Sequence, residues 1–154
     1  MKEDIDLYHP ELAEVGYKIT SEENISYNCI AWAAGDNTQW WECYEHGPAN
    51  SPGYYWPPGA KFGYSTEALV SAYETLGYWV CQNSDFELGY EKVALYALDG
   101  EWKHAARQLP EGSWTSKLGE WEDVRHERPE DASGSIYGNV FCIMKRAIKK
   151  KKII

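Results

Sequence analysis

Two residues far apart in the chain could together carry out nucleophilic chemistry. Cys29 follows Asn28 in the stretch "SYNCIAWAAGDN", residues 26–37, and His104 lies 75 positions further along. A cysteine at the start of a helix, with a histidine beside it, is an arrangement that favours a thiolate near neutral pH. Only the fold could bring the two together, so the elements that carry them must be identified first.

The cysteine is predicted to begin a short helix. Asn28 is a suitable N-cap, because its side chain can accept hydrogen bonds from the free N–H groups of the first turn. The helix should run from Cys29 to about Ala34 and stop at Gly35, a residue type common at helix ends. A clearer helix is predicted in residues 65–78, "STEALVSAYETLGY", whose apolar residues fall on one stripe.

The histidine is predicted to lie on a β-hairpin. Residues 91–109, "EKVALYALDGEWKHAARQL", hold an Asp-Gly pair between two strand-like runs, which is typical of a type I′ turn. With that turn, the numbers of cross-strand partners add to 199, and His104 lies opposite Leu95. Alternation then places His104 on the same face as Trp102 and Ala106, the apolar face that should pack on a helix.

Two further strands are predicted after the hairpin. Residues 113–119, "SWTSKLG", should return beside the histidine strand and bring Ser116 or Lys117 level with residues near Ala105. A polar segment follows, and a final strand is expected within residues 135–147.

The order of these elements is a Cys-bearing helix, a second helix, and then antiparallel strands that carry a histidine. This order resembles that of the papain-like cysteine hydrolases, in particular the NlpC-type cell-wall amidases. The motifs N-C-x-A-x-A, H-A-A-R-Q and S-K-L-G also resemble those of a bacterial family of unassigned function, over roughly residues 26–146. The resemblance implies an α+β, papain-like core in which the Cys-bearing helix packs on a small antiparallel sheet. It also implies Cys29 as nucleophile and His104 as general base.

The third, orienting residue does not carry over directly from the resemblance. In the related hydrolases it is a polar residue on the strand after the histidine, and here that strand offers Ser116 and Lys117. Serine orients an imidazole weakly. Either Asp123 or His126 therefore reaches back to His104, or the site is a dyad.

The chemistry that this site implies is acyl transfer at an amide or ester carbonyl. The backbone N–H of Cys29, and the side chain of Asn28, would hold the developing oxyanion. Water would complete hydrolysis by a peptidase, amidase or deamidase, whereas an amine acceptor would make the protein a transferase. A peptide or protein substrate is expected, and no cofactor.

The long segment 37–64 is rich in Gly, Pro and Asn and yet dense in aromatic residues. Long loops of this kind inside a compact domain are usually functional. Trp40, Trp41 and Trp56 could form one wall of a substrate cleft, or they could cover one side of the core. Lys117 is a further candidate for substrate contact.

A metal site is one alternative interpretation. Cys43 and His46 have C-x-x-H spacing. Further zinc ligands could in principle come from His9, Cys81, His126 and Cys142. The chain lacks a second paired half-site, so the sequence predicts no metal.

A second alternative is a non-catalytic interaction module, or an inactive papain-like relative, that binds a partner through an acidic, aromatic surface. Cys29, Cys81 and Cys142 would then fill the core, which is a common role for cysteine.

Composition limits the remaining possibilities. The 154 residues predict one domain, with an irregular lead-in at 1–25, a core at 26–146 and a basic tail at 147–154. The net charge of -9 argues against a nucleic-acid partner. No apolar run is long enough for a membrane span, and no signal peptide is recognised. A cytoplasmic protein is expected, with delivery as an effector by a non-Sec route left open.

Overall fold

The computed structural model describes residues 2–43 and 54–148. Its main element is a seven-stranded sheet in the order β1-β8-β7-β6-β5-β9-β4, in which every neighbouring pair is antiparallel. With its helices, this makes the fold α+β, as predicted. The strands are β1 (Lys18–Ile19), β4 (Trp79–Cys81), β5 (Tyr90–Leu98), β6 (Glu101–Gln108), β7 (Trp114–Lys117), β8 (Asp123–His126) and β9 (Asn139–Ala147).

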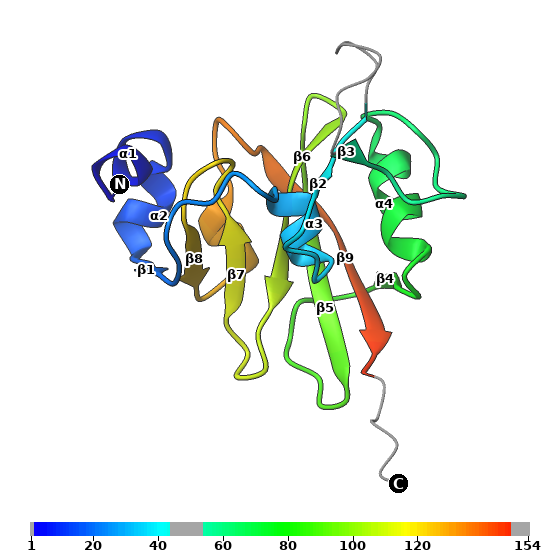
Figure 1. Ribbon diagram of the computed structural model, residues 1–154. Helices are drawn as coiled ribbons and strands as arrows, with labels where there is room; N and C mark the ends of the chain where they lie inside the picture. Colours follow the sequence, from blue (N-terminus) through cyan, green and yellow to red (C-terminus); the bar gives the residue numbers. More distant parts are fainter. Residues whose placement is uncertain (1, 44–53, 149–154) are drawn as a thin grey trace, which may run out of the picture.

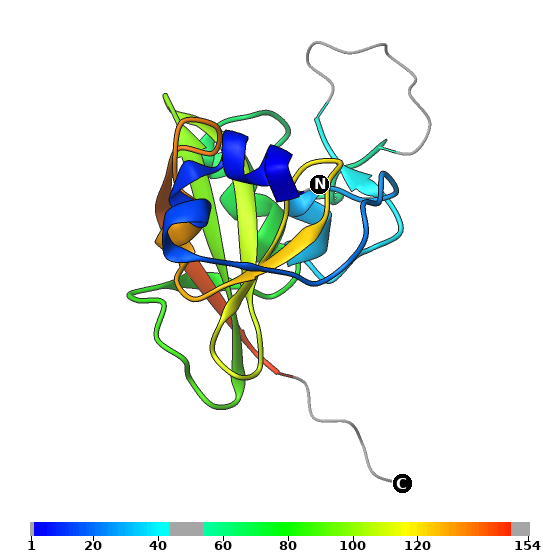
Figure 2. The same ribbon diagram turned by 90° about the vertical axis from the view of Figure 1, so that its left-hand side faces the viewer.

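Helices cover both faces of this sheet (Figures 1 and 2). One face packs on α3 and α4 in a first core cluster that includes Leu95 and Ala105. The other face packs on α1 and α2 in a second cluster that includes Tyr96 and Ala106. The remaining elements are α1 (Lys2–Tyr8), α2 (Pro10–Val15), α3 (Cys29–Ala33), α4 (Thr66–Glu74), the 3-10 turn η1 (Pro129–Ala132) and the parallel pair β2 (Trp40–Trp41) and β3 (Tyr54–Tyr55).

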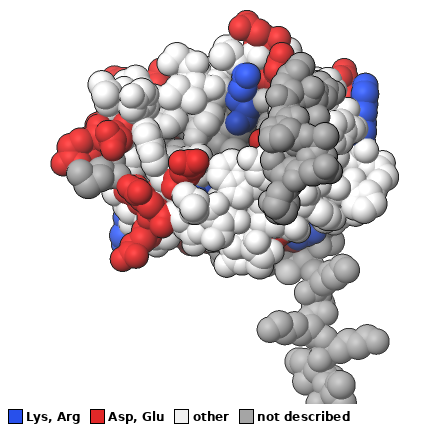
Figure 3. Space-filling model, turned by 45° about the horizontal axis from the view of Figure 1, so that its top comes forward, with Lys and Arg blue, Asp and Glu red and all other residues white. Residues whose placement is uncertain are grey.

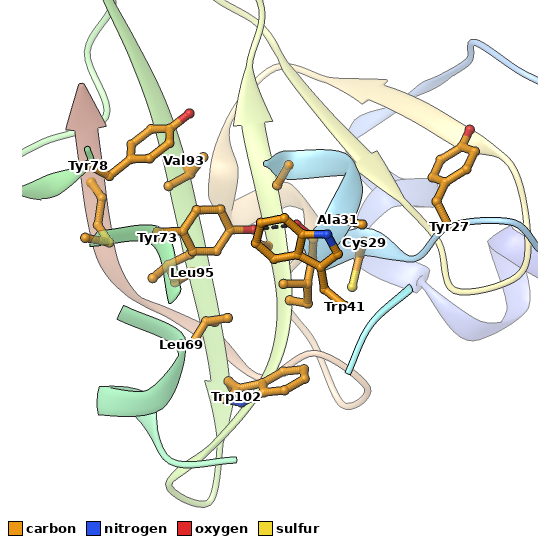
Figure 4. Close-up of a cluster of buried hydrophobic side chains, with 14 residues drawn as sticks. Tyr27, Cys29, Ala31, Trp41, Leu69, Tyr73, Tyr78, Val93, Leu95 and Trp102 are labelled. Atoms are coloured by element: carbon orange, nitrogen blue, oxygen red, sulfur yellow. Dashed lines mark hydrogen bonds between the residues drawn. The ribbon is translucent and has the colours of Figure 1, made fainter. Parts of the chain in front are cut away.

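The two predicted helices form where local capping signals place them. The Asn28 side chain accepts a hydrogen bond from the backbone N–H of Ala31 at the start of α3, and Gly35 follows the helix with a φ of 85°. Ser65 caps α4 in the same way. Tyr73 from α4 reaches along the same face of the sheet and donates a 2.7 Å hydrogen bond to the carbonyl of Ile30 in α3 (Figure 4).

The predicted hairpin forms, but its register differs from the expected one. The turn residues Asp99 and Gly100 both have positive φ, as a type I′ turn requires. A β-bulge then follows, because Ala97 pairs with Trp102 whereas Tyr96 pairs with His104. Lys103 is the extra residue, and it shifts the remaining pairs by one position.

This bulge corrects the predicted orientation of the histidine. Trp102 belongs to the first core cluster. His104 instead shares its face with Ala106 and contacts Tyr96, which belongs to the second cluster. The prediction that His104 lies opposite Leu95 and on the same face as Trp102 was therefore wrong.

Two segments predicted to be irregular or merely polar contain regular structure. The lead-in forms α1 and α2, because Ile5 and Leu12 are fully buried against the sheet and Pro10 begins α2 rather than interrupting a helix. The polar segment after β7 forms strand β8, which pairs with β7 and β1. The basic tail lies largely outside the described residues.

Candidate active site

Cys29 lies where α3 meets a part of β6 that β7 leaves unpaired. The two strands pair only at Arg107 with Thr115 and at Gln108 with Trp114, and α3 contacts both. The Cys29 sulfur lies 4.0 Å from the carbonyl oxygen of Lys103, the bulged residue. The thiol therefore rests on the backbone immediately before His104.

The environment of the thiol favours its protonated form. Cys29 is only 8% exposed, and burial raises the pKa of its thiol to about 12. The backbone N–H of Ala105 lowers this pKa, as do those of Ile30 and Cys29 itself, and the charge of Glu42 raises it. These three contributions do not outweigh the desolvation of the sulfur.

His104 lies fully buried in the second core cluster. Its ring stacks on that of Tyr137, with centroids 3.9 Å apart and an interplanar angle of 7°. It also meets the Tyr96 ring at a centroid distance of 4.9 Å. Burial lowers the pKa of His104 well below its ordinary value, and the nearby His126 and His9 lower it further. The expected pair of a Cys29 thiolate and a protonated His104 is thus disfavoured in this structure.

A chain of hydrogen bonds fixes the tautomer of His104. His126 Nδ1 lies 2.8 Å from the carbonyl of Arg128, which can only accept, so this nitrogen carries a proton. Burial keeps His126 neutral by lowering its pKa, and its Nε2 therefore accepts from the Ser116 hydroxyl at 2.8 Å. Ser116 Oγ in turn accepts from His104 Nε2–H at 2.9 Å. The lone pair of His104 is left on Nδ1, which is buried and has no hydrogen-bond partner in the described part of the chain.

These hydrogen bonds show which candidate for the orienting residue contacts His104. Ser116 contacts His104 directly, and His126 contacts Ser116. Asp123 lies on the other face of the sheet, where its carboxylate accepts a 3.0 Å hydrogen bond from the Tyr27 hydroxyl. Ser116 is therefore the only one of the three that the structure places against the imidazole.

Asn28 has a structural task in addition to its cap. Its Oδ1 accepts from the backbone N–H groups of Ala31 and Trp41, and its Nδ2 donates to the Trp41 carbonyl at 2.8 Å. These bonds hold the side chain between α3 and β2. The Asn28 amide is therefore engaged by backbone groups of α3 and β2.

The predicted substrate wall is not one continuous surface. Trp41 is buried in the first core cluster, where its Nε1 donates to Asp36. Trp56 stacks on Trp102 at 5.6 Å, and Trp40 stacks on Tyr54 at 6.1 Å. Of the two alternatives that the sequence left open, Trp41 follows the second, because its indole fills the core.

Lys117 is buried, and its ammonium group serves the turn that follows β7. It donates to the carbonyls of Gly119 and Trp121 at 2.6 Å each and lies 5.2 Å from the centroid of the Tyr27 ring. Burial lowers its pKa. In this structure Lys117 stabilises the S-K-L-G turn rather than presenting a charge to a ligand.

The residues of the alternative metal site are scattered. No group of three or more His, Cys, Asp or Glu side chains in the described ranges is arranged to hold a metal ion. The Cys43 sulfur accepts a hydrogen bond from the backbone N–H of Gly63, and His46 lies outside the described residues.

The comparisons with known proteins give one match. Residues 18–145 match the model of a family described as a domain of unknown function, DUF7689. The chain belongs to this family. The part of the chain that matches DUF7689 begins after α1 and α2 and contains Cys29, His104 and Ser116. A search of curated proteins and a search of solved structures each found no match.

Tyr137 is the contact that sequence reasoning missed. It stacks on His104 because the chain makes a narrow loop in which Gly134 and Gly138 exchange backbone hydrogen bonds. Gly138 passes so close to the carbonyl of Ala97 that an added Cβ would lie 2.0 Å from that oxygen. The glycines beside Tyr137 were the available signal of a close backbone approach.

Proposed function

We propose that this protein is a cysteine-dependent amide hydrolase with a papain-like core, acting on peptide or protein amides through Cys29 and His104. The observation that carries the proposal is that the Cys29 sulfur lies 4.0 Å from the carbonyl oxygen of Lys103, the residue before His104, whose Nδ1 is buried without a hydrogen-bond partner in the described part of the chain. A general base needs such a lone pair and a fixed ring. Ser116 fixes the ring through Nε2. The bulge at Lys103 also fits, because bulges are common beside active sites.

In the proposed reaction, His104 Nδ1 takes the thiol proton as the Cys29 sulfur attacks the amide carbon. The backbone N–H groups of Cys29 and Ala105 stabilise the oxyanion. Collapse of the tetrahedral intermediate breaks the C–N bond, and the leaving amine takes the proton from His104. Water then cleaves the thioester, which yields the carboxylic acid and regenerates the thiol. An amine in place of water would give transfer instead.

The proposed reaction requires a change on substrate binding, because both side chains are buried and they pack in different core clusters, Cys29 in the first and His104 against Tyr96 and Tyr137 of the second. Tyr137 covers the His104 ring and also forms part of the wall of a hollow of about 370 Å³, together with His9 and Trp121. A substrate that enters through this hollow must displace the Tyr137 ring. Exposure of the thiol would lower its pKa, because desolvation is the largest cause of the raised value.

The test uses p-nitrophenyl acetate as an acyl donor, with mass spectrometry to locate the acetyl group. We expect acetylation of Cys29 at pH 7 in the wild-type protein, and none at this position in Cys29→Ala. His104→Asn should slow the reaction by roughly 100-fold or more, the usual range for removal of a general base. Cys142→Ala is the matched control, since Cys142 is a half-buried cysteine whose thiol pKa is also raised. This variant should be acetylated at Cys29 as the wild type is.

A non-catalytic module is the second candidate, favoured by the raised pKa of the buried Cys29 thiol. Asp and Glu side chains gather over the end of the molecule that carries α1 and α2 (Figure 3). Glu3, Asp4, Glu11 and Glu14 are exposed there and would meet a basic partner. If Cys29 remains unmodified while the unfolded chain is acetylated at all four cysteines, the hydrolase proposal fails and this second candidate stands.

A further inference from the structure

A second hollow lies at the end of the sheet where β5 begins and β6 ends. The turn that joins these two strands is at the opposite end of the sheet (Figure 1). Its volume is about 420 Å³. Most of its wall is apolar, and three of the wall residues are strongly exposed to solvent: Phe86 (49%), Ile148 (53%) and Leu88 (89%). Exposed apolar side chains that surround a hollow often indicate a ligand-binding site.

One positively charged side chain in this wall, Arg107, forms no ion pair within the described part of the chain. Burial raises the pKa of the Asp123 carboxyl, and the charge of Arg107 partly offsets this rise. Arg107 packs its guanidinium 5.0 Å from the centroid of the Trp32 ring. Its Nε is buried without a hydrogen-bond partner, and no described carboxylate forms an ion pair with it. A guanidinium that is partly buried without a hydrogen-bond partner loses hydration that the protein does not replace, so a bound anion would stabilise it.

Two other polar side chains of the hollow already have partners. Glu91 forms an ion pair with Arg146. Gln108 donates to the carbonyls of Ser84 and Gly112. Arg107 is therefore the charged wall residue for which the described part of the chain shows neither a hydrogen bond nor an ion pair of the side chain.

We propose that this hollow binds a small carboxylic acid with a flexible apolar chain, such as a medium-chain fatty acid. The guanidinium of Arg107 holds the carboxylate through paired N–H donors, a geometry that guanidinium groups match well. The apolar chain lies against Phe86, Leu88 and Ile148. This site is separate from the Cys29 site and does not depend on the proposed hydrolase activity.

Decanoate, used below its micelle-forming concentration, is the probe. Isothermal titration calorimetry measures its affinity, and the indole N–H signal of Trp32 in NMR spectra locates it, since Trp32 contacts Arg107. We expect binding with a shift of the Trp32 signal. Arg107→Gln should weaken binding by roughly tenfold or more, as loss of a charge-assisted hydrogen bond does. Leu88→Asp should also weaken it.

Arg125→Gln is the matched control, because it removes the same charge from a partly exposed arginine that pairs with Glu111 and does not line the hollow. Its affinity for decanoate should equal that of the wild type. Decan-1-ol, which has the chain without the charge, should bind the wild type roughly tenfold more weakly than decanoate. Equal affinity of Arg107→Gln and wild type, equal binding of alcohol and acid, or no change at Trp32 would each overturn the proposal. The last two comparisons use the wild-type protein, so they hold even if Arg107→Gln folds poorly.

Discussion

His104 Nε2 lies 2.9 Å from Ser116 Oγ, and the same hydroxyl lies 2.8 Å from His126 Nε2. Ser116→Ala would leave a donor and an acceptor unsatisfied in the core. We expect the free energy of unfolding to fall by about 1–3 kcal/mol, the usual cost of buried unpaired polar groups. Urea unfolding followed by tryptophan fluorescence measures this change.

Ser113→Ala is the control for that substitution. The Ser113 hydroxyl bonds to Glu111, whose carboxylate is exposed, so water can replace the lost partner. Its cost should stay below about 1 kcal/mol. Equal losses for the two variants would mean that Ser116 does not link the two histidines.

The buried histidines predict that the protein loses stability in mild acid. Burial lowers the pKa of His104 and of His126 in the folded state. Below about pH 6.5 the unfolded chain therefore binds protons that the folded chain does not. The free energy of unfolding is therefore highest above that pH, and it falls as the pH decreases, by at most about 1.4 kcal/mol per pH unit for each of these histidines.

Urea unfolding at several pH values in this range measures that dependence. His104→Gln is neutral at every pH, so it should show a smaller slope of stability against pH than the wild type, by roughly one proton. An unchanged slope would contradict the assignment of His104 as a neutral, buried imidazole.

Gly138→Ala should be strongly destabilising. At this residue φ is 73°, and an added Cβ would lie 2.0 Å from the Ala97 carbonyl oxygen. Backbone strain and steric overlap together should cost about 3 kcal/mol or more. Gly89 has a similar φ of 87°, but no atom lies within 4 Å of an added Cβ. Gly89→Ala should therefore cost only about 1–2 kcal/mol. Thermal or urea unfolding of the two variants gives the comparison, which fails if they are equally stable.

The two neighbouring tryptophans of β2 should behave differently. Trp41 is 4% exposed in the first core cluster, so Trp41→Ala should cost about 3–5 kcal/mol. Trp40 is only partly buried and stacks on Tyr54, so Trp40→Ala should cost about 1 kcal/mol. Urea unfolding of both variants distinguishes a core role from a surface role, and a larger loss for Trp40 would reverse our assignment.

The sequence predicts features that depend on neighbouring residues. The start of α3 at Cys29 follows from the cap at Asn28, and the hairpin turn follows from Asp99 and Gly100. The position of Ser116 near the histidine strand follows from the length of the intervening turn, and its hydrogen bond to His104 agrees with that estimate.

Features that depend on distant packing were not predictable in this way. The two N-terminal helices are too short to show a periodic pattern, and only Ile5 and Leu12 are buried in them. The face of His104 depends on a bulge, which adds one residue without changing the alternation of residue types. The buried state of Trp41 depends on Asn28, whose side chain binds the backbone of β2.

Lys103 takes part in none of the cross-strand pairs between β5 and β6. Deleting it would leave Trp102 and His104 adjacent and still on opposite faces, with the same partners and the same two-residue turn. In the hairpin Lys103 is therefore an insertion that strand pairing does not require. Its carbonyl is nevertheless the group that the Cys29 thiol contacts. A chain without Lys103 would therefore keep the pairing of β5 with β6 and lose the contact between this carbonyl and the Cys29 thiol.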